Sequence, residues 1–169
     1  MSSILYFSGS SALPAFQSER LLQRFQSLDL PVQHIAAYYE YYVWTADEGL
    51  SPEQQQRLEA LLDDGLPTYD LQSQAKDQLV LRVIPRLGTV SPWASKATDI
   101  ARNCGLSGVR RIERGVRYVV DPARGLLGAK SLKADQLQLI AAQLHDRMTE
   151  SVVDQSFDGA ALFQELPPN

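Results

Sequence analysis

Cys104 is the one cysteine of the chain, and its thiol is the side chain here best suited to nucleophilic catalysis. It would need a histidine as its base, and the chain offers His34 and His145. A helix predicted over Pro92–Cys104, however, puts the thiol at its last turn, on the apolar side, where small buried thiols are common. The sequence therefore favours a core position for Cys104, and it predicts no catalytic residue.

Phosphate and metal sites are equally absent from the sequence. Neither a Walker sequence nor a Gly-x-Gly-x-x-Gly pattern occurs, so no phosphate-binding loop is predicted. His34 and His145 lie far apart, and one cysteine cannot form a thiolate cluster for zinc. His145 is interpreted as a solvated or helix-capping residue, and His34 is given no role. We expect no cofactor and no metal ion in this chain.

An aromatic cluster in the segment Val32–Trp44 has two possible purposes. Its members occupy both faces of a predicted strand: Tyr38, Tyr39, Tyr41, Tyr42 and Trp44. Exposed rings on a sheet stack on bases in RNA-binding proteins. The alternative is a sheet covered by helices on one face and by a partner on the other, which also favours these residue types. The formal charge of −4, without a matching basic groove, favours the second alternative and no nucleic-acid partner.

Four arginines form the nearest approach to a basic patch. Strand alternation divides them between two faces, with Arg110 and Arg114 on the face of Ile112 and Arg111 and Arg117 on the other. A divided patch is a poor track for phosphates. It more often indicates ion pairs at a domain interface.

The size and composition are those of one globular domain, or of two small halves fused into one. The 169 residues are 44% hydrophobic and 21% charged, and no apolar run is long enough to cross a bilayer, so no membrane partner is expected. No signal peptide is predicted, because the apolar run Ile4–Phe7 is short and no basic region precedes it. One cysteine excludes an internal disulfide and fits a cytoplasmic location.

Eight predicted elements follow one another in the order β-α-β-α, twice. Apolar runs and alternation predict four strands, at Ile4–Phe7, Val32–Trp44, Gln78–Ile84 and Val109–Val120. Helical spacing predicts four helices, at Ala15–Leu28, Pro52–Asp63, Pro92–Cys104 and Lys133–Glu150. Ser51 and Ser91 each precede a proline that suits a first helical turn, and Gly65 and Gly105 follow the same two helices.

The two β-α-β-α halves resemble each other, which indicates an internal repeat. Offsets between matching residues stay between 77 and 82, as in Pro14 with Pro92, Val43 with Val120 and Leu62 with Leu144. The prediction is an α+β fold, a fused pseudo-dimer in which two halves, about 1–64 and 78–150, share one four-stranded antiparallel sheet with helices chiefly on one face.

The stretch Val83–Tyr118 carries the most specific pattern in the chain, VIPRLGTVSPWASKATDIARNCGLSGVRRIERGVRY. Its core runs from Pro85-Arg86 through Ser91-Pro92-Trp93 and Asp99-Ile100 to Asn103-Cys104-Gly105-Leu106. This pattern resembles the amino-terminal signature of the large formylglycinamide ribonucleotide amidotransferases. The later segments Ile112–Gly115 and Leu144–Glu150 fit the same family. The resemblance covers about Ile4–Val153 and is weaker in the first half.

The resemblance implies both a fold and a function. Residues 1–150 are similar to a fused dimer of the small, PurS-like subunit, and residues 151–169 resemble the start of a linker. The implied parent is phosphoribosylformylglycinamidine synthase of de novo purine biosynthesis, an ATP- and magnesium-dependent ligase that hydrolyses glutamine and channels ammonia. Its synthetase and glutaminase domains are then the partners of this chain, which by itself is expected to be inactive.

Ser95, Lys96 and Asp99 are polar positions within this signature that lie off the apolar stripe of the predicted helix. An exposed Lys96–Asp99 pair would stabilise the helix by only about 0.2–0.5 kcal/mol, so fold stability explains these residues poorly. We hypothesise that this face meets the synthetase core, with Arg114 as a charged companion. The alternative is a free-standing ferredoxin-like binding or regulatory module, which has no reason to carry the signature.

Overall fold

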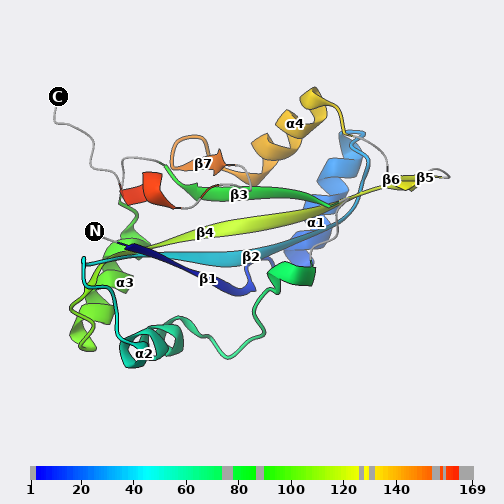
Figure 1. Ribbon diagram of the computed structural model, residues 1–169. Helices are drawn as coiled ribbons and strands as arrows, with labels where there is room; N and C mark the ends of the chain where they lie inside the picture. Colours follow the sequence, from blue (N-terminus) through cyan, green and yellow to red (C-terminus); the bar gives the residue numbers. More distant parts are fainter. Residues whose placement is uncertain are drawn as a thin grey trace, which may run out of the picture.

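One antiparallel sheet of five strands runs through the centre of the molecule (Figure 1). The computed structural model describes residues 3–73, 78–86, 90–125, 128–129, 132–153, 157 and 159–163. The strands lie in the order β1-β2-β4-β3-β7, with bounds Ser3–Ser11 for β1, Val32–Thr45 for β2, Leu79–Pro85 for β3, Val109–Pro122 for β4 and Glu150–Val153 for β7. The predicted α+β class is confirmed. The predicted count of four strands is wrong, because β7 pairs with β3.

Four helices pack on this sheet. Their bounds are Ala15–Ser27 for α1, Pro52–Leu62 for α2, Pro92–Asn103 for α3 and Ala134–Leu144 for α4. The smaller elements are two 3-10 turns, η1 at Leu71–Ser73 and η2 at Ala160–Phe163, and a ribbon of β5, Arg124–Gly125, with β6, Gly128–Ala129. In the part of the chain that the structure describes, no helix is both long enough and apolar enough to span a membrane.

The helix starts predicted at the two serines are confirmed. The Ser51 hydroxyl accepts a hydrogen bond from the Gln54 backbone N–H, and the Gln54 side chain accepts one from the Ser51 N–H in return. The Ser91 hydroxyl accepts from the Ala94 N–H in the same way. After α3, Gly105 adopts φ of +88°, a left-handed conformation that ends the helix at little steric cost.

The fourth helix is shorter than its sequence predicts, and a strand follows it. It ends at Leu144, and the next residue, His145, is already extended. The cause is Asp146, whose side chain accepts a hydrogen bond from the Met148 N–H and whose carbonyl accepts from the Glu150 N–H. An aspartate that bonds its own backbone in this way competes with the helix. Met148, which lies within the predicted helix Lys133–Glu150, is consequently outside α4 and 74% exposed.

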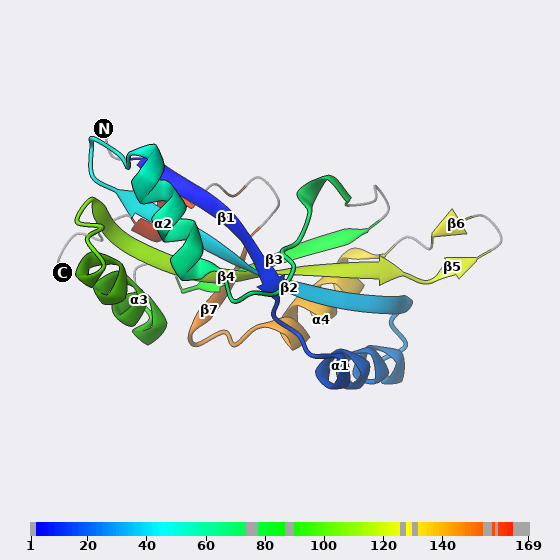
Figure 2. The ribbon, with the colours of Figure 1, turned by 90° about the horizontal axis from the view of Figure 1, so that it is seen from below.

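All four helices cover the same face of the sheet, which we call the helical face. Phe25 of α1 and Ile140 of α4 pack on Ile35 of β2 and Val120 of β4. The second cluster joins Leu58 of α2 and Ala101 of α3 to Val43, Leu106, Val109 and Ile112. Figure 2 shows α2 and α3 towards one end of the sheet and α1 and α4 towards the other.

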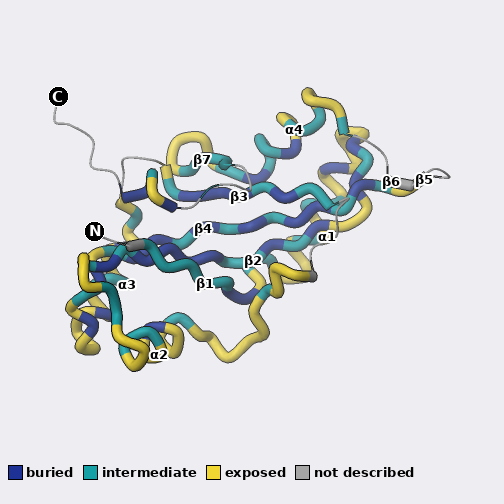
Figure 3. Tube along the Cα trace, in the orientation of Figure 1, coloured by how far each residue is buried: buried dark blue, intermediate teal, exposed yellow. Residues whose placement is uncertain are grey.

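The reverse of the sheet, the opposite face, is covered in part by the end of the chain. Leu162 and Phe163 of η2 pack against Tyr42 of β2 and Ile84 of β3. Each of these residues is nearly or fully buried. Figure 3 shows buried residues, in dark blue, along β2, β4 and β3. Burying a side chain of this size stabilises a fold by about 1.5–3 kcal/mol, so the segment from 159 to 163 belongs to this domain.

The two β-α-β-α halves contribute to the sheet in a symmetrical order. Each half has its first strand outside, β1 or β3, and its second strand inside, β2 or β4. The inner strands pair with each other, with Val43 opposite Ile112 and Ile35 opposite Val120. This order is the one that a two-fold axis between β2 and β4 would produce.

Candidate functional site

The outer side of α3 carries the polar residues predicted to meet another domain. Ser95, Lys96 and Asp99 are all exposed. Trp93 and Ala97 face the other way and pack against the cluster of apolar residues beneath α2 and α3. Among the described residues no ion pair joins Lys96 to Asp99, so both charges are available to solvent or to a partner.

Lys96 also borders an apolar groove between α2 and α3, which lie beside each other in Figure 2. The groove has a volume of about 270 Å³, and its lining is Leu58, Leu61, Leu62, Trp93, Lys96, Ala97, Ile100, Ala101 and Ile112. Two of its side chains remain open to solvent, Leu61 with 40% and Ile100 with 54% of their surface exposed. The open space beside Ile100 explains why this apolar side chain is only half covered.

Arg114 lies on the helical face near the start of α3 and does not line the groove, although it contacts Trp93, which does. Its guanidinium carbon is 4.4 Å from the centre of the Tyr39 ring and 4.6 Å from that of Trp93. At these distances the rings attract the cation and hold it in place. Arg114 and Trp93 line a separate shallow hollow of about 250 Å³ that also includes Ser91 and Glu150. The structure therefore brings Lys96 to the groove but does not place Arg114 with it.

Two of the other three arginines form contacts inside the domain, and the third, Arg110, is exposed and lies 4.0 Å from the exposed Asp47. Arg111 pairs with Glu113, which is fully buried, and Arg117 with Glu40. Arg110 does not share the face of Ile112 as predicted, because it lies 5.3 Å from the centre of the Trp44 ring on the opposite face. The cause is a register shift between β2 and β4: Trp44 pairs with Arg111 and Thr45 with Val109, so Arg110 is an extra residue and regular alternation does not predict its face.

A buried charge network on the opposite face was missed by the sequence analysis. Its centre is Glu40, 1% exposed, whose carboxylate lies 3.1 Å from the Nε of Arg82 and 2.7 Å from that of Arg117. The hydroxyl of Tyr6 donates to the same carboxylate at 2.5 Å and that of Tyr42 at 3.0 Å. The available signal was a single charge in each of two otherwise uncharged strand segments, AAYYEYYVW around Glu40 and LVLRVIP around Arg82.

Opposing effects set the pKa of Glu40. Burial raises it, but the hydrogen bond from Tyr6 and the charges of Arg82 and Arg117 together lower it below the ordinary value of 4.5. Burial, followed by the nearby charge of Glu40, raises the pKa of Tyr6 to about 12. Glu40 is therefore ionised and Tyr6 neutral at physiological pH. A carboxylate locked between two guanidinium groups has a structural role and is not available as an acid or base.

The tyrosines of β2 do not form an exposed stacking platform. Tyr42 is fully buried, and Phe157 packs edge-on against its ring on the opposite face. Tyr38 stacks on Tyr69, with 4.4 Å between ring centres. Leu162 and Phe163 of the same chain cover part of this face, and the prediction that a partner covers it remains a prediction for the rest.

A family model for the formylglycinamide ribonucleotide amidotransferase N-terminal domain matches residues 38–163. The match extends from β2 to η2 and includes α3, the groove and the residues that cover the opposite face. The chain belongs to this family. Its members are domains of the amidotransferase of purine biosynthesis, and the resemblance noted at Val83–Tyr118 lies within the matched segment.

In this amidotransferase domain the single thiol is not in the core. Cys104 is exposed, because α3 ends at Asn103 and the chain turns there to insert Leu106 into the apolar cluster. His34 lies 3.4 Å from Asp121, and the Nδ1 of His145 lies 2.5 Å from the Ala141 carbonyl at the end of α4. In the described residues no group of three or more histidine, cysteine, aspartate or glutamate side chains is arranged to hold a metal ion.

Proposed function

We propose that this chain is a non-catalytic assembly domain of the amidotransferase. In this proposal it holds the synthetase core and the glutaminase domain in the arrangement that ammonia transfer requires. ATP and magnesium then act in the synthetase core, and this chain turns over neither glutamine nor ATP by itself. The family match supports the parent enzyme, and the surface of α3 supports the assembly role.

The observation that carries the assembly role is the groove between α2 and α3. Scattered apolar residues are normal on a protein surface, but here two half-exposed apolar side chains, Leu61 and Ile100, flank one hollow. Lys96 lies at the same groove, and Asp99 follows on the exposed side of α3. An apolar centre bordered by charged residues is the usual composition of an interface between domains. We assign this surface, Lys96, Asp99, Ile100 and Leu61, to contact with the synthetase core.

The test compares one double substitution in two settings. Lys96→Ala with Asp99→Ala should change the free energy of unfolding of the isolated domain by no more than about 0.5 kcal/mol, because both side chains are exposed. The same double substitution in the full-length amidotransferase should lower its synthetase activity, or the fraction of hydrolysed glutamine that yields product. Denaturant unfolding and a paired assay of glutaminase and synthetase rates measure the two quantities.

A matched control uses another exposed charge pair, Glu19→Ala with Arg20→Ala on α1, at the other end of the helical face. This variant should leave both rates unchanged. The interface assignment fails if the two double variants behave alike in the full-length enzyme. It also fails if the Lys96 and Asp99 variant destabilises the isolated domain by several kcal/mol, since those residues would then be structural.

A further inference from the structure

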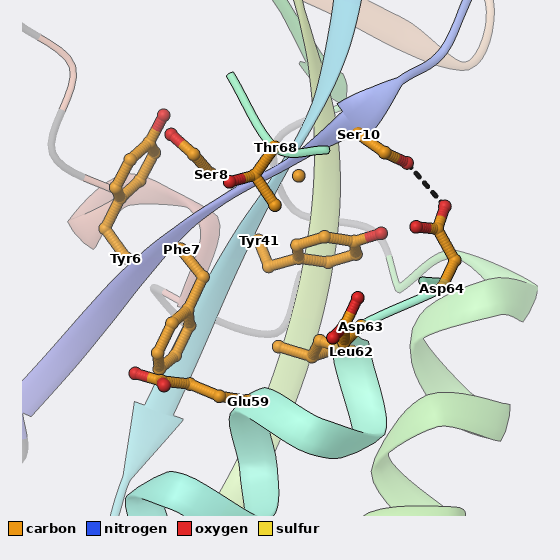
Figure 4. Close-up of a pocket in the computed structure, with 11 residues that line it drawn as sticks. Tyr6, Phe7, Ser8, Ser10, Tyr41, Glu59, Leu62, Asp63, Asp64 and Thr68 are labelled. Carbon is orange, nitrogen blue, oxygen red and sulfur yellow. Dashed lines mark hydrogen bonds between the residues drawn. The ribbon is translucent and has the colours of Figure 1, made fainter. Parts of the chain in front are cut away.

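A hollow lies beside the edge strand β1, on the other side of α2 from the groove (Figure 4). It has a volume of about 390 Å³, within the range of small-ligand sites. Its walls come from four parts of the chain: residues 6–10 of β1, Tyr41 of β2, Glu59 and Leu62 at the end of α2, and Asp63, Asp64 and Thr68 of the loop that follows.

The hollow exists because the outer strand of the second half, β3, pairs with a further strand, whereas among the described residues the outer strand of the first half, β1, does not. In the second half, β7 pairs with β3 from Pro85 to Arg82. At the repeat offset of 82 the counterpart of β7 is residues 68–71, which the structure does not join to β1 as a strand. One backbone bond joins this segment to the strand, from the Tyr69 N–H to the Gly9 carbonyl at 3.0 Å. The edge of β1 at residues 6–10, which pairs with no further described strand, therefore faces the hollow.

The lining of the hollow is negatively charged. Its ionisable carboxylates are Glu59, Asp63 and Asp64, all exposed at the rim, and none of the described residues that line it is a lysine or an arginine. The hydroxyl of Ser10 donates to Asp64, the dashed contact in Figure 4. This hydrogen bond is the main cause that lowers the pKa of Asp64 below its ordinary value, and a bond from the Leu66 backbone N–H adds to it, so the carboxylate stays ionised.

One polar group inside the hollow has no partner in the described chain. Tyr41 is only 8% exposed, yet its hydroxyl makes no hydrogen bond to any described residue, and its ring stands in the middle of the hollow with the oxygen towards Asp64 and Ser10 (Figure 4). Gly9 makes this position possible, because a Cβ there would lie 2.8 Å from the Tyr41 ring and 2.9 Å from the Tyr39 carbonyl. The oxygen of this hydroxyl borders the open space of the hollow, where it can donate a hydrogen bond to a ligand or accept one from it.

We propose that this hollow binds an organic cation, an ammonium or guanidinium group carried on a short aliphatic stem. The three carboxylates supply the opposite charge at the rim. The rings of Phe7 and Tyr41 supply an apolar wall for the stem and an aromatic face for the cation. The carboxylates are not clustered closely enough for a metal ion among the described residues, which favours a larger cation with a spread charge. The cation is either a free small molecule or the side chain of an arginine or lysine in a partner segment.

The test is a titration of the 169-residue chain, followed by the amide NMR signals of residues 6–10 and 59–68. The probes are n-butylguanidinium and its neutral isostere n-butylurea. A second pair of probes, capped Gly-Arg-Gly and capped Gly-citrulline-Gly, presents the same two groups on a peptide. We expect the charged member of at least one pair to bind and its neutral isostere not to bind. Tighter binding of the peptide identifies a partner side chain as the natural ligand, and equal or weaker binding identifies a free cation.

Three variants and a control test the named residues. Asp64→Asn should weaken binding of the cation about tenfold and Tyr41→Phe about fivefold, since each removes one interaction of about 1–1.5 kcal/mol. Glu59→Gln, Asp63→Asn and Asp64→Asn combined should abolish it. Glu48→Gln, at an exposed carboxylate before α2, should not change it.

The proposal is overturned if charged and neutral probes bind equally, if the triple variant binds as the natural chain does, or if neither cation shifts a signal at millimolar concentration. None of these variants touches Lys96 or Asp99. If cation binding is not observed, the assembly role is therefore unaffected. If the assembly role fails its own test, the cation-binding proposal is likewise unaffected.

Discussion

Arg82 and Arg117 converge on the carboxylate of Glu40 beneath the segment that ends in Leu162 and Phe163. All three charged side chains are nearly buried, with 9% or less of their surface exposed. Removing one member of such a group costs far more than a surface ion pair contributes, because the remaining charges stay buried. Arg82 also donates to the Phe157 carbonyl at 2.8 Å, so the network joins the sheet to the end of the chain.

We predict that Glu40→Gln destabilises the domain by about 3–5 kcal/mol at neutral pH. The folded-state pKa of Glu40 is lowered, so its contribution to stability is complete above the unfolded value near 4.5 and is lost as the pH falls below it. Denaturant unfolding between about pH 6 and pH 3 should therefore show a smaller loss of stability in the variant than in the natural chain. Parallel curves would contradict the lowered pKa, and Glu48→Gln serves as the exposed control.

At the scale of the element, two helix starts of the same design differ in one contact. Ser51 caps α2 and Ser91 caps α3, each by accepting a backbone N–H. Only Ser91 also donates its hydroxyl to a buried carboxylate, that of Glu113, at 3.1 Å. The second bond joins α3 to β4 and thereby fixes the helix that presents Lys96.

We predict that Ser51→Ala costs about 1 kcal/mol, the usual value of a lost cap. Ser91→Ala should cost about 1 kcal/mol more, because a buried carboxylate oxygen also loses a donor. Chemical denaturation of the two variants gives the comparison directly. Equal costs would mean that the Ser91 hydroxyl acts only as a helix cap.

At the scale of the whole molecule, the pairing of the inner strands is compatible with two-fold symmetry. An offset of 77 carries Val43 to Val120 and Ile35 to Ile112. The structure pairs Val43 with Ile112 and Ile35 with Val120, so the offset exchanges these two pairs with each other. The outer strands break the symmetry, because β7 extends the sheet on one side and the hollow lies on the other.

We predict that residues 4–64 superpose on residues 79–148 through a rotation of about 180° between β2 and β4. The superposition should hold for the inner strands and the helices, and it should not extend to residues 68–71 and 150–153, because the described part of the first half has no counterpart of β7. An experimental structure of the domain provides the measurement. A rotation far from 180°, or inner strands that do not overlap, would mean that the halves only share an order of elements.

Much of the secondary structure was predictable because its causes are local. The capping serines, the prolines behind them and Gly105 act within one turn of the chain, so α2 and α3 begin and end within about one residue of the predicted positions. The apolar alternation placed β2 and β4 for the same reason. The family signature at Val83–Tyr118 is also a property of adjacent residues, and the family match confirmed it.

Contacts between distant residues decided the rest. The strand β7 forms because β3 has a free edge with which it can pair. The spacing of apolar residues in Lys133–Glu150 carries no information about that edge. Glu40 and Arg82 are 42 residues apart in the sequence and meet only because β2, β4 and β3 are neighbours in the sheet. The exposed Cys104 and the hollow around Tyr41 likewise depend on where the chain goes after α3 and after α2. By itself the sequence determined the elements whose causes are local, such as α2, α3, β2 and β4, and the family to which the chain belongs. Only the tertiary structure decided which polar groups are buried together and which surfaces stay open, because burial is a property of packing and not of spacing along the chain.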